Sequence, residues 1–300
     1  MTDRPILKTL LGRYPNTRAL RDGVLKAASF DYDFLDIAVP NRAFKRVVRE
    51  LAFDVAELAL VTYFQARAHG KPLALLPAVV GAGRFQHHCL VYNAERARVT
   101  VAQLHGKRVG IRAYAQTTVT WVRGVLAQEY GVALPDVRWV TFEDGHLAEF
   151  PDPPGVERAP AGASAVEMLL AGELDAAIVG TDLPDDPRLQ PVLPDPHAAA
   201  VAWSERLRLL PINHMVTVDL ALVRERPELV REVYATLLQS KALARAATKA
   251  EGADLTPFGV EPNRRALEVL LGYCAAQGLI PKPMSVDDLF ADTEHLLEPA

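Results

Sequence analysis

The chain has 300 residues, of which 50% are apolar and 23% are charged, and its formal net charge is -4 at pH 7. This length allows two hydrophobic cores. The lack of a basic excess argues against a protein that binds nucleic acid. No apolar run is long enough to span a bilayer, so we expect no membrane insertion.

The compartment is predicted from the cysteines and the N-terminus. Cys89 and Cys274 lie far apart in the sequence and predict no disulfide framework. The first residues contain no apolar segment of the kind found in signal peptides. We therefore expect a cytoplasmic protein, or a periplasmic one if a leader has been removed.

Apolar segments typical of strands alternate with helical patterns along the chain. The predicted strands are residues 6–11, 34–39, 55–61, 73–80, 89–92, 108–112, 137–141, 176–179 and 214–223. Apolar positions at helical spacing predict helices over 44–51, around 121–131, after Ser164, from Pro227 and around 267–271. Residues 150–163 and 183–197 are rich in proline and predict surface loops.

This alternation predicts an α/β fold with parallel sheets covered by helices. Two longer alternating segments, residues 85–93 and 212–223, are the expected crossings between two lobes. Residues 1–92 and 214–300 would form a discontinuous lobe, and residues 93–213 a continuous one. Because ligands bind at the carboxyl ends of strands in such sheets, we expect a ligand in a cleft between the lobes.

Three polar side chains in strand segments are the candidate catalytic groups. Glu57 lies inside an apolar strand, so it is either an edge residue that faces water or an acid or base that faces the cleft. His88 and His214 lie in the two crossing segments, where each is a candidate proton donor or a core histidine bonded to a backbone carbonyl. If the crossings pair, His87 or His88 would lie near His214.

A metal site is not predicted. His87 and Cys89 would share one face of a strand, but no third ligand accompanies them. One of the two adjacent histidines should face the cleft, so His87 is also a candidate substrate contact.

The segment after the strand 108–112 is the candidate anion site. Gln116, Thr117 and Thr118 begin the next helix, where backbone N–H groups and the positive helix end favour a carboxylate. A threonine N-cap with nothing bound is the alternative. Arg112 lies at the strand end beside this helix, and its guanidinium fork matches a carboxylate.

Further candidate contacts lie in other segments. Arg18 and Arg84 are either carboxylate clamps or members of surface ion pairs. Tyr14 and Tyr114 lie in loop-like segments and could stack on an aromatic ring.

Five stretches in a fixed order resemble a known family. They are Phe53-Asp-Val-Ala-Glu-Leu, Arg84-Phe-Gln-His-His, Gly106-Lys-Arg-Val-Gly, Trp121-Val-Arg-Gly-Val-Leu-Ala-Gln-Glu-Tyr-Gly-Val and Pro211-Ile-Asn-His-Met. The chain resembles the 4,5-dihydroxyphthalate decarboxylase family from about Leu7 to about Leu243, and that family is similar to the type II periplasmic binding proteins. The resemblance implies a two-lobed fold of that type, each lobe a mostly parallel sheet flanked by helices.

Two segments depart from the family pattern. The opening loop reads Arg13-Tyr-Pro-Asn-Thr-Arg, where the family has an Asp-Tyr-Asp-Arg-Thr-Arg type of segment. Tyr14, Thr17 and Arg18 keep the family's residues, and the resemblance implies that they contact substrate. In the second lobe Arg112 replaces an acid.

The resemblance implies non-oxidative decarboxylation of a hydroxylated, phthalate-like aromatic carboxylate without a cofactor. A general acid such as His88 or His214 would protonate the ring carbon from which CO2 leaves. The alternatives are a solute-binding protein that serves a transporter permease, or a ligand sensor, for a small aromatic carboxylate. A homodimer is compatible with each of these hypotheses.

Overall fold

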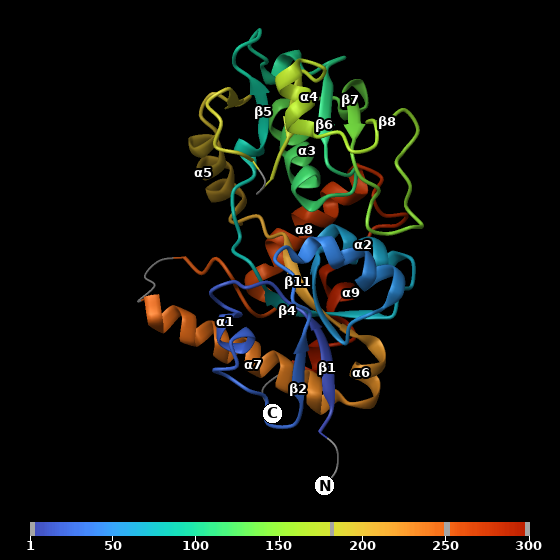
Figure 1. The fold of residues 1–300 in the computed structure, drawn as a ribbon, viewed down its shortest axis with the longest axis vertical. Coiled ribbons are helices and arrows are strands. Elements are labelled where there is room, and N and C mark those ends of the chain that lie inside the picture. Colours follow the sequence, from blue (N-terminus) through green and yellow to red (C-terminus); the bar gives the residue numbers. More distant parts are fainter. Residues whose placement is uncertain (1–3, 181–182, 249–252, 298–300) are drawn as a thin grey trace. The chain divides into compact units, whose positions relative to one another are not determined.

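A computed structural model describes residues 4–180, 183–248 and 253–297 of the chain. The chain divides into two compact units, each with its own sheet (Figure 1). Unit 1 comprises Met1–Arg84, Ile212–Leu271 and Ile280–Ala300, and unit 2 comprises Phe85–Pro211 and Gly272–Leu279.

Unit 1 contains a five-stranded sheet in the order β2-β1-β3-β11-β4. The strands are β1 (Ile6–Leu10), β2 (Asp31–Phe34), β3 (Val55–Ala59), β4 (Leu73–Val79) and β11 (His214–Asp219). β1 runs parallel to β2 and β3, whereas β11 runs antiparallel to both β3 and β4. β11 is therefore the one reversed strand among the described strands of this sheet.

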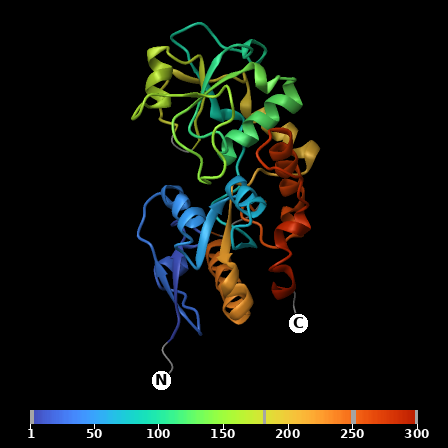
Figure 2. The ribbon, with the colours of Figure 1, turned by 90° about the vertical axis from the view of Figure 1, so that its right-hand side faces the viewer.

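Helices bury the apolar faces of the unit 1 sheet. The long helix α7 (Pro227–Thr248, orange) begins at the predicted proline and packs its apolar stripe on the strands (Figure 2). The other helices of this unit are α1 (Arg18–Arg21), α2 (Leu60–Ala68), α6 (Leu220–Glu225), most of α8 (Glu261–Ala276), α9 (Val286–Phe290) and α10 (Glu294–Leu297), with a 3-10 turn at Pro40–Ala43 and a π-helix at Arg46–Glu50.

Unit 2 contains a six-stranded sheet in the order β10-β5-β9-β6-β7-β8. β5 is antiparallel to β9 and β10, and the remaining neighbours are parallel. α3 (Thr117–Tyr130) packs on one face through Val119, Val122 and Leu126, and α4 (Ala165–Ala171) belongs to a separate apolar cluster. The strands are β5 (Leu90–Asn93), β6 (Arg108–Ile111), β7 (Arg138–Thr141), β8 (Glu157–Arg158), β9 (Ala176–Ile178) and β10 (Leu189–Pro191), and α5 (Pro196–Leu207) and 3-10 turns at His87–Cys89, Val101–Gln103 and Leu134–Asp136 complete the unit.

The predicted α/β class is confirmed, with two mixed sheets. The two reversed strands, β5 and β11, lie in the two alternating segments that were singled out in the sequence. They belong to different sheets, so the two segments do not pair with each other. No helix in the described part of the chain combines the length and apolar character needed to cross a membrane.

Some strand boundaries were predicted wrongly. The edge strand ends at Phe34, where we expected it to begin, and the ends of two predicted strands are helical because α2 starts at Leu60 and α6 at Leu220. Asp219 ends β11 and caps α6 by accepting a hydrogen bond from the backbone N–H of Ala221 at 2.7 Å. A buried strand and the buried helix turn that follows it form one apolar run, so hydrophobicity alone does not place the boundary.

Two predicted loops also contain regular structure. Residues 150–163 include β8, and residues 183–197 include β10 and the start of α5. Asp195 accepts a hydrogen bond from the backbone N–H of Ala198 at 2.9 Å, and Pro196 occupies the first helical position. This cap was a readable signal for α5.

Candidate functional site

A cluster of polar side chains surrounds Glu57 inside unit 1. The Glu57 side chain is 0% exposed, and its carboxylate accepts three hydrogen bonds. The donors are the backbone N–H of Gly12, the hydroxyl of Tyr14 at 2.8 Å and Nδ1 of His214 at 3.1 Å. Glu57 is therefore a buried acid whose two oxygens both accept hydrogen bonds, and it is not an edge residue that faces water.

The sheet brings these residues together at the carboxyl ends of parallel strands. Gly12 and Tyr14 follow β1, and Glu57 lies near the end of β3. On the antiparallel neighbour β11, His214 pairs with Ala59 and Val216 pairs with Glu57. Side chains two positions apart across a strand pair share one face, so Glu57 and His214 meet diagonally. This edge of an α/β sheet is where ligands ordinarily bind.

Tyr14 is fixed by its loop as well as by Glu57. Thr17 accepts a hydrogen bond from the backbone N–H of Tyr14 at 3.0 Å, and it donates from its hydroxyl to the carbonyl of Gly12. A Cβ at position 12 would lie 2.6 Å from the Tyr14 ring, so a larger residue there would displace the ring. Burial, followed by the neighbouring Glu57 charge, raises the pKa of Tyr14 above its usual range. Tyr14 is therefore a neutral donor at physiological pH.

His214, like the partly exposed Tyr14, reaches the surface. Its side chain is 24% exposed, and its ring meets the Phe44 ring edge-on at 5.2 Å between centroids. Because Glu57 holds Nδ1, the tautomer with hydrogen on Nδ1 is favoured and Nε2 is left for other partners. A carboxylate behind an imidazole orients the ring, as suits a proton donor.

In unit 2 the predicted anion segment joins β6 to α3. Gln116 occupies the N-cap position without a side-chain cap, and the first helical hydrogen bond runs from the N–H of Thr120 to the carbonyl of Gln116 at 2.9 Å. Thr117 and Thr118 are buried in the first turn. Arg112 is partly buried, and its Nε has no hydrogen-bond partner among the described residues.

The two adjacent histidines do not lie on a strand. His87, His88 and Cys89 form a 3-10 turn, so the expected alternation of faces was wrong. His87 is buried against Trp203, with 5.4 Å between ring centroids, and burial lowers the pKa of His87 to about 4. Nε2 of His88 lies 3.8 Å from Sγ of Cys89. In the described ranges, His, Cys, Asp and Glu side chains form no group of three that could hold a metal ion.

The remaining predicted contacts belong to three other segments of the chain. Arg18 is exposed at the first position of α1, directly after Thr17. Arg84 is partly buried at the end of the first segment of unit 1. Tyr114 is partly buried and packs against the core of unit 2.

Sequence comparison identifies relatives along most of the chain. A 4,5-dihydroxyphthalate decarboxylase from Comamonas testosteroni is 28% identical over 317 residues, which cover 95% of this chain and 96% of that protein. A protein of the same name from Pseudomonas putida is 30% identical over 213 residues, which cover 67% of this chain and 82% of that protein. The chain belongs to the 4,5-dihydroxyphthalate decarboxylase family. The resemblance stated from the sequence is thereby confirmed, although no family model matches the chain.

Comparison with solved structures identifies proteins that have the same fold as this decarboxylase family member. The alkanesulfonate-binding protein SsuA from Xanthomonas axonopodis pv. citri, bound to MOPS, superposes with a TM-score of 0.61 at 13% identity. The match covers 96% of this chain and 99% of that chain. The predicted likeness to periplasmic binding proteins is confirmed at the level of the fold.

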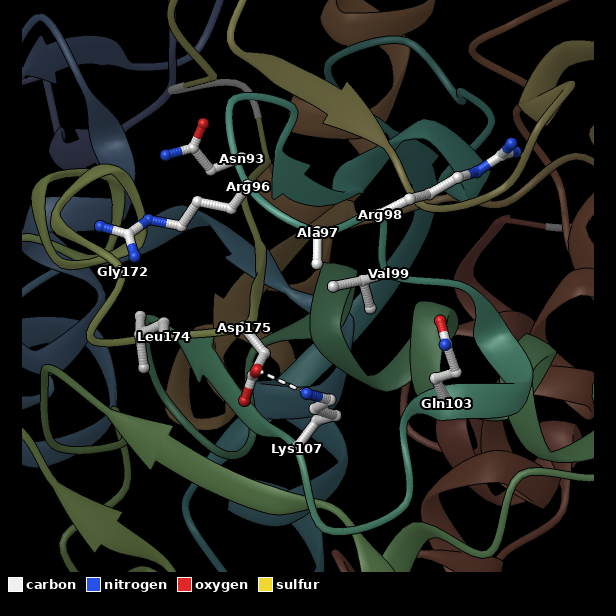
Figure 3. A pocket seen from close by; sticks show the side chains of 10 residues that line it. All are labelled: Asn93, Arg96, Ala97, Arg98, Val99, Gln103, Lys107, Gly172, Leu174 and Asp175. Carbon is white, nitrogen blue, oxygen red and sulfur yellow. Dashed lines mark hydrogen bonds and ion pairs between the residues drawn. The ribbon is translucent and has the colours of Figure 1, made fainter.

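A cavity of about 350 Å³ in unit 2 lies outside the predicted site of this family member (Figure 3). Two of its basic side chains, Lys107 and Arg96, already have partners. Lys107 pairs with Asp175 at 2.9 Å, and Arg96 donates to the carbonyl of Ala171 while lying over Gly172. Figure 3 shows Arg98 pointing away from Lys107 and Asp175. The cations do not converge on one point, so we assign this cavity no role.

Proposed function

We propose that this chain catalyses the non-oxidative decarboxylation of a hydroxylated, phthalate-like aromatic carboxylate. The observation that carries the proposal is the buried Glu57 carboxylate, which holds both Tyr14 and His214. The two relatives named 4,5-dihydroxyphthalate decarboxylase support the same activity.

The proposed reaction needs a proton on a ring carbon. A hydroxyl group on the ring feeds electrons toward the carbon that bears the departing carboxylate. His214, protonated on Nε2, delivers a proton to that carbon, and the C–C bond to the carboxylate then breaks to release CO2. Glu57 keeps the imidazole oriented and Tyr14 keeps Glu57 in place, while general acid catalysis of this kind contributes about a hundredfold to ten-thousandfold in rate.

The second carboxylate of a phthalate needs a binding site that does not react. In the proposal this role falls to Arg112 and to the start of α3 with Thr117 and Thr118. An arginine fork and a helix N-terminus both favour a carboxylate.

A binding protein without catalysis is the second candidate function. The likeness of the fold to that of a sulfonate-binding protein favours it. In that case the Tyr14, Glu57 and His214 cluster would orient a ligand by hydrogen bonds alone.

Measuring CO2 release distinguishes a decarboxylase from a binding protein without catalysis. The parent protein is incubated with 4,5-dihydroxyphthalate and related hydroxylated acids, with single-turnover CO2 release and calorimetric binding measured in parallel. We expect His214→Gln to lower turnover by at least about a hundredfold while affinity falls little, because the lost proton acts in the transition state. His88→Gln tests the second histidine predicted from the sequence.

The matched control is His105→Gln, since His105 is an exposed histidine paired with Asp136. Binding without CO2 release by the parent would establish the binding protein. Unchanged turnover in both the His214 and His88 variants would show that neither histidine is the acid.

A further inference from the structure

Arg123 is an arginine completely enclosed by unit 2. Its side chain is 0% exposed, and Nη2 donates to the carbonyl of Tyr114 at 2.7 Å. Nε and Nη1 have no hydrogen-bond partner in the described ranges of the chain. The titratable groups that act on its charge are the Tyr114 hydroxyl and the buried Cys274 thiol, and neither is a carboxylate.

Packing alone does not account for an arginine at this position. Its helical neighbours Val122, Val125 and Leu126 are buried apolar residues. A buried cation without an anion lowers stability relative to an apolar residue of similar size. Burial lowers the pKa of Arg123 to about 10, so the guanidinium still carries its charge at neutral pH.

The charge of Arg123 is directed toward the start of its own helix. Side chains on an α-helix lean toward the N-terminus, and Arg123 accordingly contacts Tyr114, which precedes the first residue of α3. Its Cζ lies 4.0 Å from the centroid of the Tyr114 ring. The guanidinium therefore adjoins the segment between β6 and α3 and fixes its backbone at Tyr114.

Two other positive features occupy the same segment. Arg112 begins it with a buried Nε that lacks a hydrogen-bond partner among the described residues. α3 ends it, and the positive end of this 14-residue helix points into the segment. Three sources of positive potential thus adjoin one short stretch of backbone, and the described residues supply Arg112 and Arg123 with no carboxylate there.

We propose that Arg123 is a positioning residue of an anion-binding site at the start of α3, where its buried charge strengthens carboxylate binding at the expense of stability. The inference rests on the proposed function for the nature of the ligand, an aromatic carboxylate. It does not require that the ligand reacts.

The test compares affinity with stability in three variants. Phthalate binding is measured by calorimetry, and melting temperature is measured without ligand. R123M and R123Q remove the charge, so the affinity for phthalate should fall by about tenfold. R123K keeps the charge and should stay within about threefold of the parent. R123M should melt at the same temperature as the parent or higher, because it replaces a buried charge that has no carboxylate partner with an apolar side chain.

A purely structural arginine would behave differently. A clear drop in the melting temperature of R123M, including failure to fold, would overturn the proposal, as would unchanged phthalate affinity in R123Q. The backbone amide signals of Thr117 and Thr118 in NMR spectra, titrated with sulfate, locate the site without an aromatic ligand. If neither sulfate nor phthalate shifts these signals, the anion site is wrong.

The same measurements keep this inference separate from the proposed function. Arg123-dependent binding of phthalate or sulfate, together with no CO2 release by the parent, would support the anion site and reject the decarboxylase. CO2 release that is independent of Arg123, with affinity unchanged in R123Q, would support the decarboxylase and reject the role of Arg123 in the anion site.

Discussion

Glu57 shows how an enclosed residue acts through its neighbours. The sequence placed an acid in an apolar strand and left two hypotheses open, an edge residue that faces water or an acid or base that faces the cleft. The structure surrounds its carboxylate with the donors of Gly12, Tyr14 and His214, and leaves the side chain 0% exposed. A substrate atom cannot reach such a group, so Glu57 is better suited to orient His214 than to transfer a proton itself.

Glu57→Gln tests this orienting role. The amide keeps the shape of the side chain but places an NH2 group where three donors now meet, so a donor is left unpaired. We expect turnover to fall by about tenfold to a hundredfold with little change in KM, and the free energy of unfolding to fall by about 1–3 kcal/mol. Single-turnover CO2 release and thermal melting measure the two effects.

Glu50→Gln is the matched control for this variant. Glu50 is an exposed carboxylate of unit 1 that pairs with Arg46 at 3.6 Å. Exposed pairs of this kind contribute at most about 1 kcal/mol, so turnover and melting should barely change. If Glu57→Gln behaves like Glu50→Gln, the buried carboxylate does not orient His214.

Single residues of the candidate site were predictable where an unusual residue stood in a regular pattern. Glu57 interrupted an apolar strand, and His214 began an alternating segment. Their contact was not predictable, because it depends on which strands are neighbours and on the register of β11 against β3. Arg123 gave no signal, since one arginine within an amphipathic helix reads as part of the exposed face.

At the scale of elements, the direction of two strands makes both sheets mixed instead of parallel. β5 and β11 come from the two alternating segments, and each runs against its neighbours. The sequence did not predict their direction, and the alternation does not reflect one exposed face, because Met215–Val218 of β11 is buried throughout. The helices α2 and α6 were missed because they begin without a break after apolar strands.

Two helical glycines should respond to alanine in opposite directions. A Cβ at Gly124, on α3, would lie 2.0 Å from the Tyr273 ring, whereas a Cβ at Gly272, on α8, meets no atom within 4 Å. Alanine at an open helical position stabilises by about 0.5–1 kcal/mol. Gly272→Ala should therefore raise the melting temperature, and Gly124→Ala should lower stability by about 1–3 kcal/mol through overpacking.

Urea unfolding of both variants gives the comparison. Each glycine serves as the control for the other, because the chemical change is identical and only the surroundings differ. A stabilised Gly124→Ala variant would mean that α3 and Tyr273 are not in close contact.

At the scale of the whole molecule, stability should depend on pH through groups that are buried in neutral form. Burial raises the pKa of the phenols of Tyr14, Tyr32 and Tyr63, so they resist ionisation in the folded chain. An unfolded phenol loses its proton near pH 10, so this contribution is present below pH 10 and is lost as the pH rises further. The free energy of unfolding should therefore fall above about pH 10.

His87 should set the pH dependence on the acidic side. Its imidazole is 3% exposed, packs against Trp203, and has a pKa lowered by burial to about 4. An unfolded histidine takes up a proton near pH 6.5, so the folded chain is favoured above pH 6.5 and loses this advantage as the pH falls toward 4. The loss amounts to about 3 kcal/mol at most.

His87→Phe keeps an aromatic ring against Trp203 but cannot be protonated, so its melting temperature should fall less steeply between pH 6.5 and 4.5. His105→Gln changes an exposed histidine and should leave the slope as it is in the parent. Equal slopes for the parent and His87→Phe, measured by calorimetry across that range, would mean that His87 is not the group that links acid to unfolding.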